Sequence, residues 1–195
     1  AHLYINNCTF SRSCLQLGLE GQYDFLDGVV GGSTCDGARR LFDVWRQYIG
    51  TPFHHVLTVP RKYTERAHKL YYDEVLQFKK HFEEHFGVQV TDEALLASTE
   101  VLNESRMLLR GLYELRKRDK PPISGAETLE VLNAAYRMPK ETFNVWLAEF
   151  IDELKASDKA FTGRARGMLI GSVLTNPEFV KSIEDQGALV VTDEL

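Results

Sequence analysis

Residues 25–59 read FLDGVVGGSTCDGARRLFDVWRQYIGTPFHHVLTV, and this stretch decides the fold class. Phe25 to Val30 is a short apolar run that ends at two glycines, which predicts a buried strand. Four apolar residues then recur at the spacing of one helix face: Ala38, Leu41, Phe42 and Trp45. A second apolar run, His55 to Val59, predicts the next strand, which Pro60 stops. Strand, helix and strand within about 35 residues predict a parallel βαβ unit.

A second unit of the same kind is predicted near the other end of the chain. Met168 to Val173 predicts a strand, and Asn176-Pro177 places a capping residue and an N1 proline before a helix that reaches about Asp185. Ala188 to Thr192 predicts the last strand. The fold class is therefore α/β, with two parallel-sheet βαβ pieces.

The segment between the two βαβ pieces is predicted to be helical. Thr64 to Ala156 consists of helix and short turns, with Thr91 and Ser124 as capping residues. An apolar stripe steps along its first helix and is predicted to be core: Tyr71, Val75, Phe78, Phe82 and Phe86. We divide the chain into a partial first α/β lobe (1–63), a helical segment (64–157) and the start of a second, truncated lobe (158–195).

Composition excludes several classes of function. The chain has 195 residues, 44% hydrophobic and 26% charged, which is ordinary for a soluble globular protein. The net charge is −5, and the basic run Arg116-Lys117-Arg118 is followed by Asp119, so nucleic acid binding is not expected. No stretch approaches the roughly 20 apolar residues of a membrane span. Three cysteines do not make a secreted disulfide framework, which predicts a reducing, cytoplasmic compartment.

The end of the chain predicts a fragment. Val190 to Leu195 lies in or just after a predicted buried strand, and a natural domain seldom ends where a strand still needs cover. The alternative is a complete small domain with a docked C-terminal strand.

Cys8 and Cys35 are the candidate metal ligands. Cys8 follows a possible strand at residues 3–5 and begins the first helix, while Cys35 follows the strand near Val30 and begins the second. The carboxyl edge of such a sheet is where ligands bind, and a helix N-terminus stabilises the thiolate that a metal needs. The double glycine before Cys35 lets a bulky group approach the backbone. Packed side chains remain the alternative, and two thiolates alone cannot complete a zinc or iron–sulfur site.

The other candidate ligands have simpler interpretations. Cys14 lies six residues after Cys8, about 240° around the helix, and is predicted to be a packing thiol. His54 and His55 point to opposite faces of a strand, so at most one of them faces any site. His81 and His85 are four residues apart but lie beside glutamates, which predicts a solvated helix face. Neither a dinucleotide fingerprint nor a phosphate loop is present.

Once these residues are placed, the sequence resembles the family of 2-hydroxyacyl-CoA dehydratases and benzoyl-CoA reductases. The motifs of this chain that carry the resemblance are Asn7-Cys8-Thr9-Phe10-Ser11-Arg12, Tyr23 to Val30, Ser33-Thr34-Cys35-Asp36 with Arg39-Arg40, Val59-Pro60-Arg61-Lys62, Asn103-x-x-Arg106, Leu115-Arg116-Lys117 and Pro121-Pro122-Ile123-Ser124-Gly125. The resemblance covers nearly the whole chain in order. It implies a subunit of two α/β lobes with helical elements between them.

The resemblance also implies a cofactor and partners. Catalytic subunits of the family hold a [4Fe-4S] cluster through three cysteines; Cys8 and Cys35 match the first two, Cys14 matches none, and the third would lie beyond Leu195. An ATP-hydrolysing activator supplies single electrons, and an acyl-CoA thioester is reduced to a ketyl-type radical anion. The implied partners are a homologous catalytic subunit, the activator subunits and a ferredoxin that donates electrons.

Three functions remain open on the sequence. Phe25 to Trp45 and Leu112 to Leu132 are most similar to the smaller subunit of ATP-dependent benzoyl-CoA reductase, which implies dearomatisation of benzoyl-CoA. The second possibility is a subunit of a 2-hydroxyacyl-CoA dehydratase, which eliminates water. The third is a non-catalytic paralogue that carries electrons.

Overall fold

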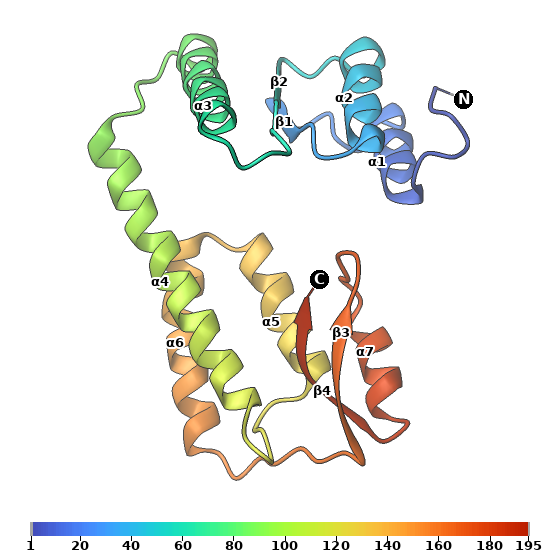
Figure 1. Cartoon of the computed structure of the whole chain (residues 1–195), viewed down its shortest axis with the longest axis vertical. Coiled ribbons are helices and arrows are strands. Elements are labelled where there is room, and N and C mark those ends of the chain that lie inside the picture. The colour runs from blue at the N-terminus through green and yellow to red at the C-terminus, as the bar shows by residue number, and fades with distance from the viewer. Residues whose placement is uncertain (1, 195) are drawn as a thin grey trace. The chain divides into compact units, whose positions relative to one another are not determined.

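The structure is a computed structural model that describes residues 2–194 (Figure 1). The chain forms two compact units, which meet in the sequence between Val90 and Thr91. In chain order the elements are α1 (Thr9–Leu19), β1 (Gly28–Gly32), α2 (Asp36–Tyr48), β2 (Phe53–Leu57), α3 (Glu65–Phe86), α4 (Asp92–Arg116), α5 (Gly125–Arg137), α6 (Lys140–Ala156), β3 (Ala165–Ile170), α7 (Pro177–Glu184) and β4 (Ala188–Glu194). The predicted α/β class and the helical middle are confirmed. The two units divide the helical middle, because α3 belongs to the first and α4 to α6 belong to the second.

The first unit is built on the parallel pair β1 and β2, with α2 as the crossover. The register runs from Gly28 opposite Phe53 to Gly32 opposite Leu57. Alternate residues of β2 face opposite sides: Phe53, 2% exposed, packs against α3, while the His54 ring lies 3.1 Å from the carbonyl oxygen of Phe42 in α2. The pair is therefore covered by α2 on one face and by α3 on the other.

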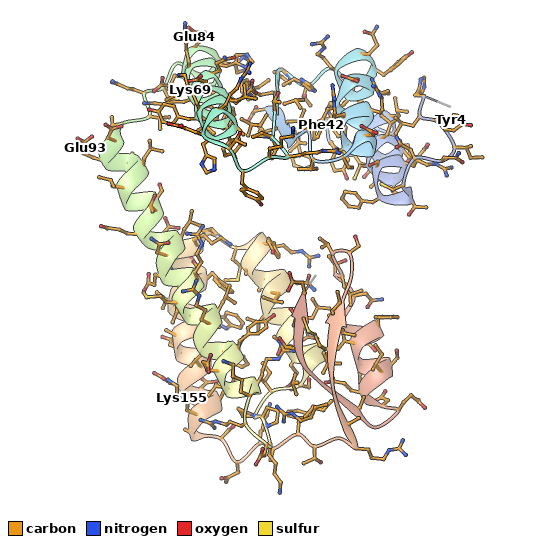
Figure 2. All side chains as sticks on the ribbon, viewed as in Figure 1. Tyr4, Phe42, Lys69, Glu84, Glu93 and Lys155 are labelled. Atoms are coloured by element: carbon orange, nitrogen blue, oxygen red, sulfur yellow. The ribbon has the colours of Figure 1, made fainter. Side chains whose placement is uncertain are left out.

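A glycine in β1 sets how closely α2 approaches the strands. A Cβ added at Gly31 would lie 1.8 Å from the Phe42 ring, a distance that no real contact allows. Phe42 points from α2 toward the β1–β2 pair (Figure 2). The bulky group that Gly31 admits is thus Phe42 of this chain, and it fixes α2, which begins beside Cys35, against the sheet.

The second unit has a helical core and a smaller α/β part. Nine residues, contributed mainly by α4, α5 and α6, form the core cluster: Leu112, Leu115, Ile123, Val131, Ala135, Phe143, Leu147, Ile151 and Leu154. The strands β3 and β4 pair in parallel with α7 as the crossover, and α5 and α7 pack together. Ser124 caps α5 in a full capping box: its side chain accepts from the Glu127 amide, and the Glu127 side chain accepts from the Ser124 amide.

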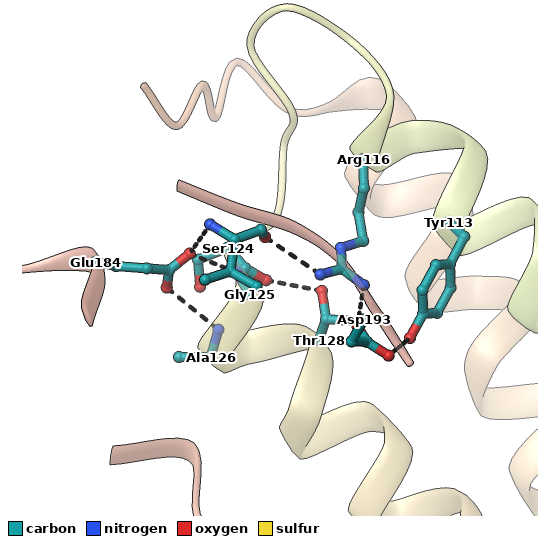
Figure 3. Close-up of polar contacts among 9 residues, drawn as sticks. Tyr113, Arg116, Ser124, Gly125, Ala126, Thr128, Glu184 and Asp193 are labelled. Carbon is teal, nitrogen blue, oxygen red and sulfur yellow. Dashed lines mark hydrogen bonds and ion pairs between the residues drawn. The ribbon is translucent and has the colours of Figure 1, made fainter. Parts of the chain in front are cut away.

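A buried ion pair ties α4 to β4 (Figure 3). Arg116, 1% exposed, donates to the Asp193 carboxylate at 2.8 Å and to the carbonyl oxygen of Val190 at 3.2 Å. The Tyr113 hydroxyl donates to the other Asp193 oxygen at 2.6 Å. Burial, followed by the bond to Asp193, raises the pKa of Tyr113 well above its usual range. A paired and hydrogen-bonded charge is tolerated inside a protein, so this group fixes the end of β4.

Strand boundaries are where the sequence predictions were wrong. Residues 3–5 are not a strand: the Tyr4 carbonyl accepts from the Asn7 amide in a turn, and no neighbouring strand in residues 2–194 pairs with them. Phe25 is 77% exposed and lies in a turn before β1, since pairing begins only at Gly28, opposite Phe53. Strand pairing also explains why two other boundaries differ from the predicted ones. β2 begins at Phe53 rather than at His55, and β3 covers Ala165–Ile170, so Val173 lies outside it.

Candidate functional site: two cysteines that cap neighbouring helices

Cys8 is the N-cap of α1. Its sulfur accepts a hydrogen bond from the Ser11 amide at 3.4 Å and lies 3.1 Å from the Ser11 hydroxyl oxygen. These two contacts lower the pKa of the Cys8 thiol, the hydroxyl being the larger cause. The unpaired amides at a helix start carry partial positive charge, which favours the thiolate. Cys8 is exposed and free, so a metal or a reagent can reach it.

Cys35 has the same role at the start of α2. Its sulfur accepts from the Ala38 amide at 3.3 Å, and Cys35 too is exposed and free. It follows β1 by three residues, so it lies at the carboxyl edge of the pair, as predicted. The prediction that both cysteines begin helices is confirmed, whereas the predicted strand before Cys8 is absent.

The two helix starts meet around Gly37. A Cβ built on Gly37 would lie 3.7 Å from the Cys35 sulfur, 3.7 Å from the Ser11 hydroxyl oxygen and 3.0 Å from the side-chain oxygen of Asn7. Ser11 in turn contacts the Cys8 sulfur. Ser11 therefore connects the surroundings of the two thiols, because its hydroxyl contacts the Cys8 sulfur and lies near Gly37, which is beside the Cys35 sulfur. Asn7 and Ser11 stand in the motif around Cys8, and Gly37 follows Cys35 by two residues, but no role for these three residues was predicted from the sequence.

Cys14 belongs to the core rather than to the surroundings of Gly37. It packs against the cluster of Leu15, Leu41 and Trp45 that joins α1 to α2. Burial raises the pKa of its thiol, and the charge of Cys8 raises it further. The expectation that Cys14 is a packing residue agrees with this position.

The described residues place two candidate metal ligands here, Cys8 and Cys35. Within residues 2–194 no group of three or more His, Cys, Asp or Glu side chains is arranged to hold a metal ion. The donor set nevertheless fits the thiolate chemistry of an iron–sulfur cluster: two free, exposed sulfurs, each stabilised by a helix amide, with a glycine beside them. Further ligands would have to come from outside these residues.

The histidines form a separate aromatic group around Phe53. The rings of His81 and His85 lie 4.6 Å and 5.2 Å from the Phe53 ring, and His81 Nδ1 lies 3.1 Å from His55 Nδ1. Burial lowers the pKa of His55, and the neighbouring His81 lowers it further. His81 and His85 are exposed, as predicted for a solvated helix face, although the Phe53 ring packs against one side of each ring.

The apolar stripe of α3 is only partly core. Phe78, Phe82 and Phe86 pack on or near Phe53, and of these Phe78 and Phe82 are partly buried whereas Phe86 is 37% exposed. Tyr71 and Val75, however, are 43% and 40% exposed, and both line a cavity of about 450 Å³. Helical spacing places these residues on one face, but the described residues cover only the C-terminal part of that face.

Comparison with known proteins identifies the family. A family model described as "2-hydroxyglutaryl-CoA dehydratase, D-component" matches residues 1–195. The chain belongs to this family. No helix within residues 2–194 combines the length and the apolar character required to cross a membrane.

Curated relatives of this dehydratase-family chain carry two kinds of name. A benzoyl-CoA reductase subunit of Thauera aromatica is 30% identical over 190 residues, covering 96% of this chain and 49% of the relative. The beta subunit of (R)-2-hydroxyglutaryl-CoA dehydratase of Acidaminococcus fermentans is 26% identical over 189 residues, covering 96% of this chain and 50% of the relative. The beta subunit of (R)-phenyllactyl-CoA dehydratase of Clostridium sporogenes is 24% identical, with 96% and 50% covered. The chain spans about half the length of these relatives.

Proposed function

We propose that this chain is part of the smaller, cluster-bearing catalytic subunit of an ATP-dependent benzoyl-CoA reductase. In that role Cys8 and Cys35 are two thiolate ligands of a [4Fe-4S] cluster, and the subunit passes electrons one at a time to an aromatic acyl-CoA thioester, whose ring is dearomatised by two electrons and two protons. The observation that carries the proposal is a pair of N-cap thiols, the first contacted by Ser11 and the second beside Gly37, with the Ser11 hydroxyl close to Gly37. The 30% identity to a benzoyl-CoA reductase subunit supports the choice of reaction.

The chain's own residues have defined tasks in this proposal. When bound, a [4Fe-4S] cluster supplies single electrons at low potential. Each helix start places a sulfur where it accepts an amide hydrogen bond, Cys8 in α1 and Cys35 in α2, and Gly37 leaves room beside the Cys35 sulfur. The Ser11 hydroxyl and amide bond the Cys8 sulfur, and hydrogen bonds to a ligand sulfur tune the reduction potential. A third cysteine ligand would come from outside the described residues.

The proposed partners follow from the reaction. The enzyme is completed by a homologous catalytic subunit, and ATP-hydrolysing activator subunits supply electrons received from a ferredoxin. ATP is required because adding one electron to an aromatic thioester is very unfavourable, and the radical needs a water-poor site that protects it from side reactions. Three free cysteines fit a cytoplasmic location, where thiols stay reduced.

A 2-hydroxyacyl-CoA dehydratase subunit is the second candidate. Two of the relatives described above are named as dehydratase beta subunits, and the cysteine positions suit both reactions. The dehydratases eliminate water without net redox change, so they need electrons only in catalytic amounts. A non-catalytic paralogue that carries electrons is the third candidate.

One activity assay separates the three. The full-length protein, purified without oxygen with its partner subunits and activator, is given ATP, a strong reductant and benzoyl-CoA or a 2-hydroxyacyl-CoA. Consumption of benzoyl-CoA with formation of a cyclic diene thioester supports the reductase. Loss of water from the 2-hydroxyacyl-CoA alone makes the protein a dehydratase subunit. If neither substrate reacts while the cluster is present and reducible, the protein is an electron carrier.

A further inference from the structure

We propose that the cavity at the carboxyl end of β2 is the binding site for the aromatic acyl group of a CoA thioester. This inference rests on the proposed function and names the place where its substrate binds. The cavity has a volume of about 450 Å³, within the usual range for small-molecule sites. It lies within the first unit, between the segment that follows β2 and the N-terminal half of α3. Its apolar lining includes Val59, Pro60, Tyr63, Tyr71, Tyr72 and Val75.

Hydrogen bonds hold the wall of this cavity to the segment that leads to Cys35. The Val59 amide donates to the Ser33 hydroxyl at 3.1 Å, and the Ser33 amide donates to the Leu57 carbonyl oxygen at 2.9 Å. Ser33 lies two residues before Cys35. The cavity and Cys35 therefore share the carboxyl edge of the β1–β2 pair, the edge at which open α/β sheets bind ligands. A group bound in the cavity therefore lies at the same edge of the β1–β2 pair as Cys35, which is proposed to hold the electron-supplying cluster.

The lining has the chemistry of an aryl-binding site. Three tyrosines contribute rings to it, and aromatic rings pack well against one another in tilted or offset arrangements. Tyr71 and Tyr72 remain 43% and 64% exposed, so their rings are free to contact a ligand. A contiguous apolar patch that stays open in this way marks a place where something binds.

The charge around the cavity selects a CoA thioester over a neutral aromatic compound. Residues 61–69 contain four Lys or Arg residues and one Glu, in a chain whose net charge is −5. Lys69 is paired with Asp73 at 3.4 Å, but Arg61, Lys62 and Arg66 form no ion pair with any residue in the range 2–194. Lys62 itself lines the cavity. A lysine in the lining of an apolar cavity, with two further arginines nearby in the sequence, suits a ligand with an apolar acyl group and several phosphate charges.

Adjacent residues of α3 provide a matched test. Val75 lines the cavity and is 40% exposed, whereas Leu76 is 45% exposed and does not line it. Val75→Trp fills the cavity, and Leu76→Trp adds the same side chain elsewhere on the helix. Both variants are made in the full-length protein with its partner subunits, without oxygen. Binding of benzoyl-CoA and of free CoA is measured by calorimetry in the absence of ATP, with iron content and helicity checked for each variant.

Of the two tryptophan variants, only Val75→Trp should lose affinity, and only for benzoyl-CoA. Val75→Trp should weaken benzoyl-CoA binding about tenfold or more, the effect expected when an apolar pocket no longer admits its group. It should leave free CoA unaffected, and Leu76→Trp should change neither. Lys62→Gln should weaken benzoyl-CoA and free CoA by the same factor, because it removes a charge and leaves the cavity intact.

Three other results overturn the inference, and they differ in what they say of the proposed function. If Val75→Trp binds benzoyl-CoA normally while the wild type binds and reduces it, the cavity assignment is wrong and the function stands. If the wild type binds no benzoyl-CoA, the cavity assignment and the proposed reductase function are both wrong. If Val75→Trp alone releases the partner subunits, protein covers the cavity and it is not a substrate site.

Discussion

The Ser11 hydroxyl oxygen lies 3.1 Å from the Cys8 sulfur, and the Ser11 amide donates to the same sulfur at 3.4 Å. One residue thus contacts the thiol through both its backbone and its side chain, in the first turn of the helix that Cys8 caps. The side-chain contact is the larger cause of the lowered pKa of Cys8. This arrangement stabilises the thiolate before any metal is bound.

The first prediction concerns the pH at which each cysteine reacts. Because its pKa is lowered, Cys8 carries more thiolate at a given pH, so its alkylation curve should lie at lower pH than that of a free thiol. Cys14 should react at higher pH, since burial and then the Cys8 charge raise its pKa. The measurement is iodoacetamide labelling of metal-free protein between about pH 6 and 10, around the usual thiol pKa, with each cysteine quantified by peptide mass spectrometry.

Two serines of α1 supply the controls for this experiment. Ser11→Ala should move the Cys8 midpoint to higher pH, because the largest stabilising contact is lost. Ser13→Ala, an exposed position on the same helix, should not move it. Equal midpoints for Cys8 and Cys14 in the wild type would show that the helix start does not favour the thiolate.

The second prediction tests the space at Gly37. Gly37→Val should lower bound iron in the anaerobically purified protein, because the new side chain would press on Asn7 and enter the region between Ser11 and the Cys35 sulfur. Helicity should stay near the wild-type value, since α2 keeps its cap. Iron per subunit and far-ultraviolet circular dichroism measure the two effects.

A glycine elsewhere provides the comparison. Gly111 lies inside α4, where an added Cβ would meet its nearest neighbour, Ile151, at an ordinary 3.9 Å. Gly111→Ala should leave iron unchanged and stabilise the protein by about 0.5–1 kcal/mol, through the reduced freedom of the unfolded chain. Normal iron content in Gly37→Val would show that the two helix starts do not hold one common cluster at Gly37.

The third prediction concerns the buried ion pair of the second unit. Asp193→Ala leaves the Arg116 guanidinium buried without its carboxylate, which should lower the free energy of unfolding by roughly 3–5 kcal/mol. Hydrogen exchange of the amides of β4 reports the loss directly. Lys155→Ala removes an exposed pair with Asp152 and should cost less than about 0.5 kcal/mol. Similar exchange rates in the two variants would show that Arg116 does not depend on Asp193.

Local signals in the sequence were enough to predict most of the helices and the parallel pairs. Thr91 and Ser124 accept the amide hydrogen bonds expected of capping residues, and Asn176-Pro177 begins α7 as its residue types indicate. Cys35 was predicted at a helix start because apolar helical spacing begins at Ala38, and Cys8 because a helix-compatible segment begins at Phe10.

Contacts between distant residues determine what the sequence could not show. Helical spacing places His81 beside glutamates, but Phe53, in a strand far along the chain, packs against its ring. Spacing also groups Tyr71 with Phe82, yet β2 reaches only the C-terminal part of α3, so Tyr71 stays open. Gly37 was missed because its importance lies in the side chain it lacks and in two helix starts that only the fold brings together.

Iron content of single cysteine variants tests the central claim most directly. The full-length protein and its partner subunits are purified without oxygen, and iron and visible absorption are measured for Cys8→Ser, Cys35→Ser and Cys14→Ser. The account predicts that the first two lose iron and the broad absorption, because a missing soft thiolate leaves one iron poorly held, while Cys14→Ser keeps both. Full iron and absorption in Cys8→Ser and Cys35→Ser would contradict it.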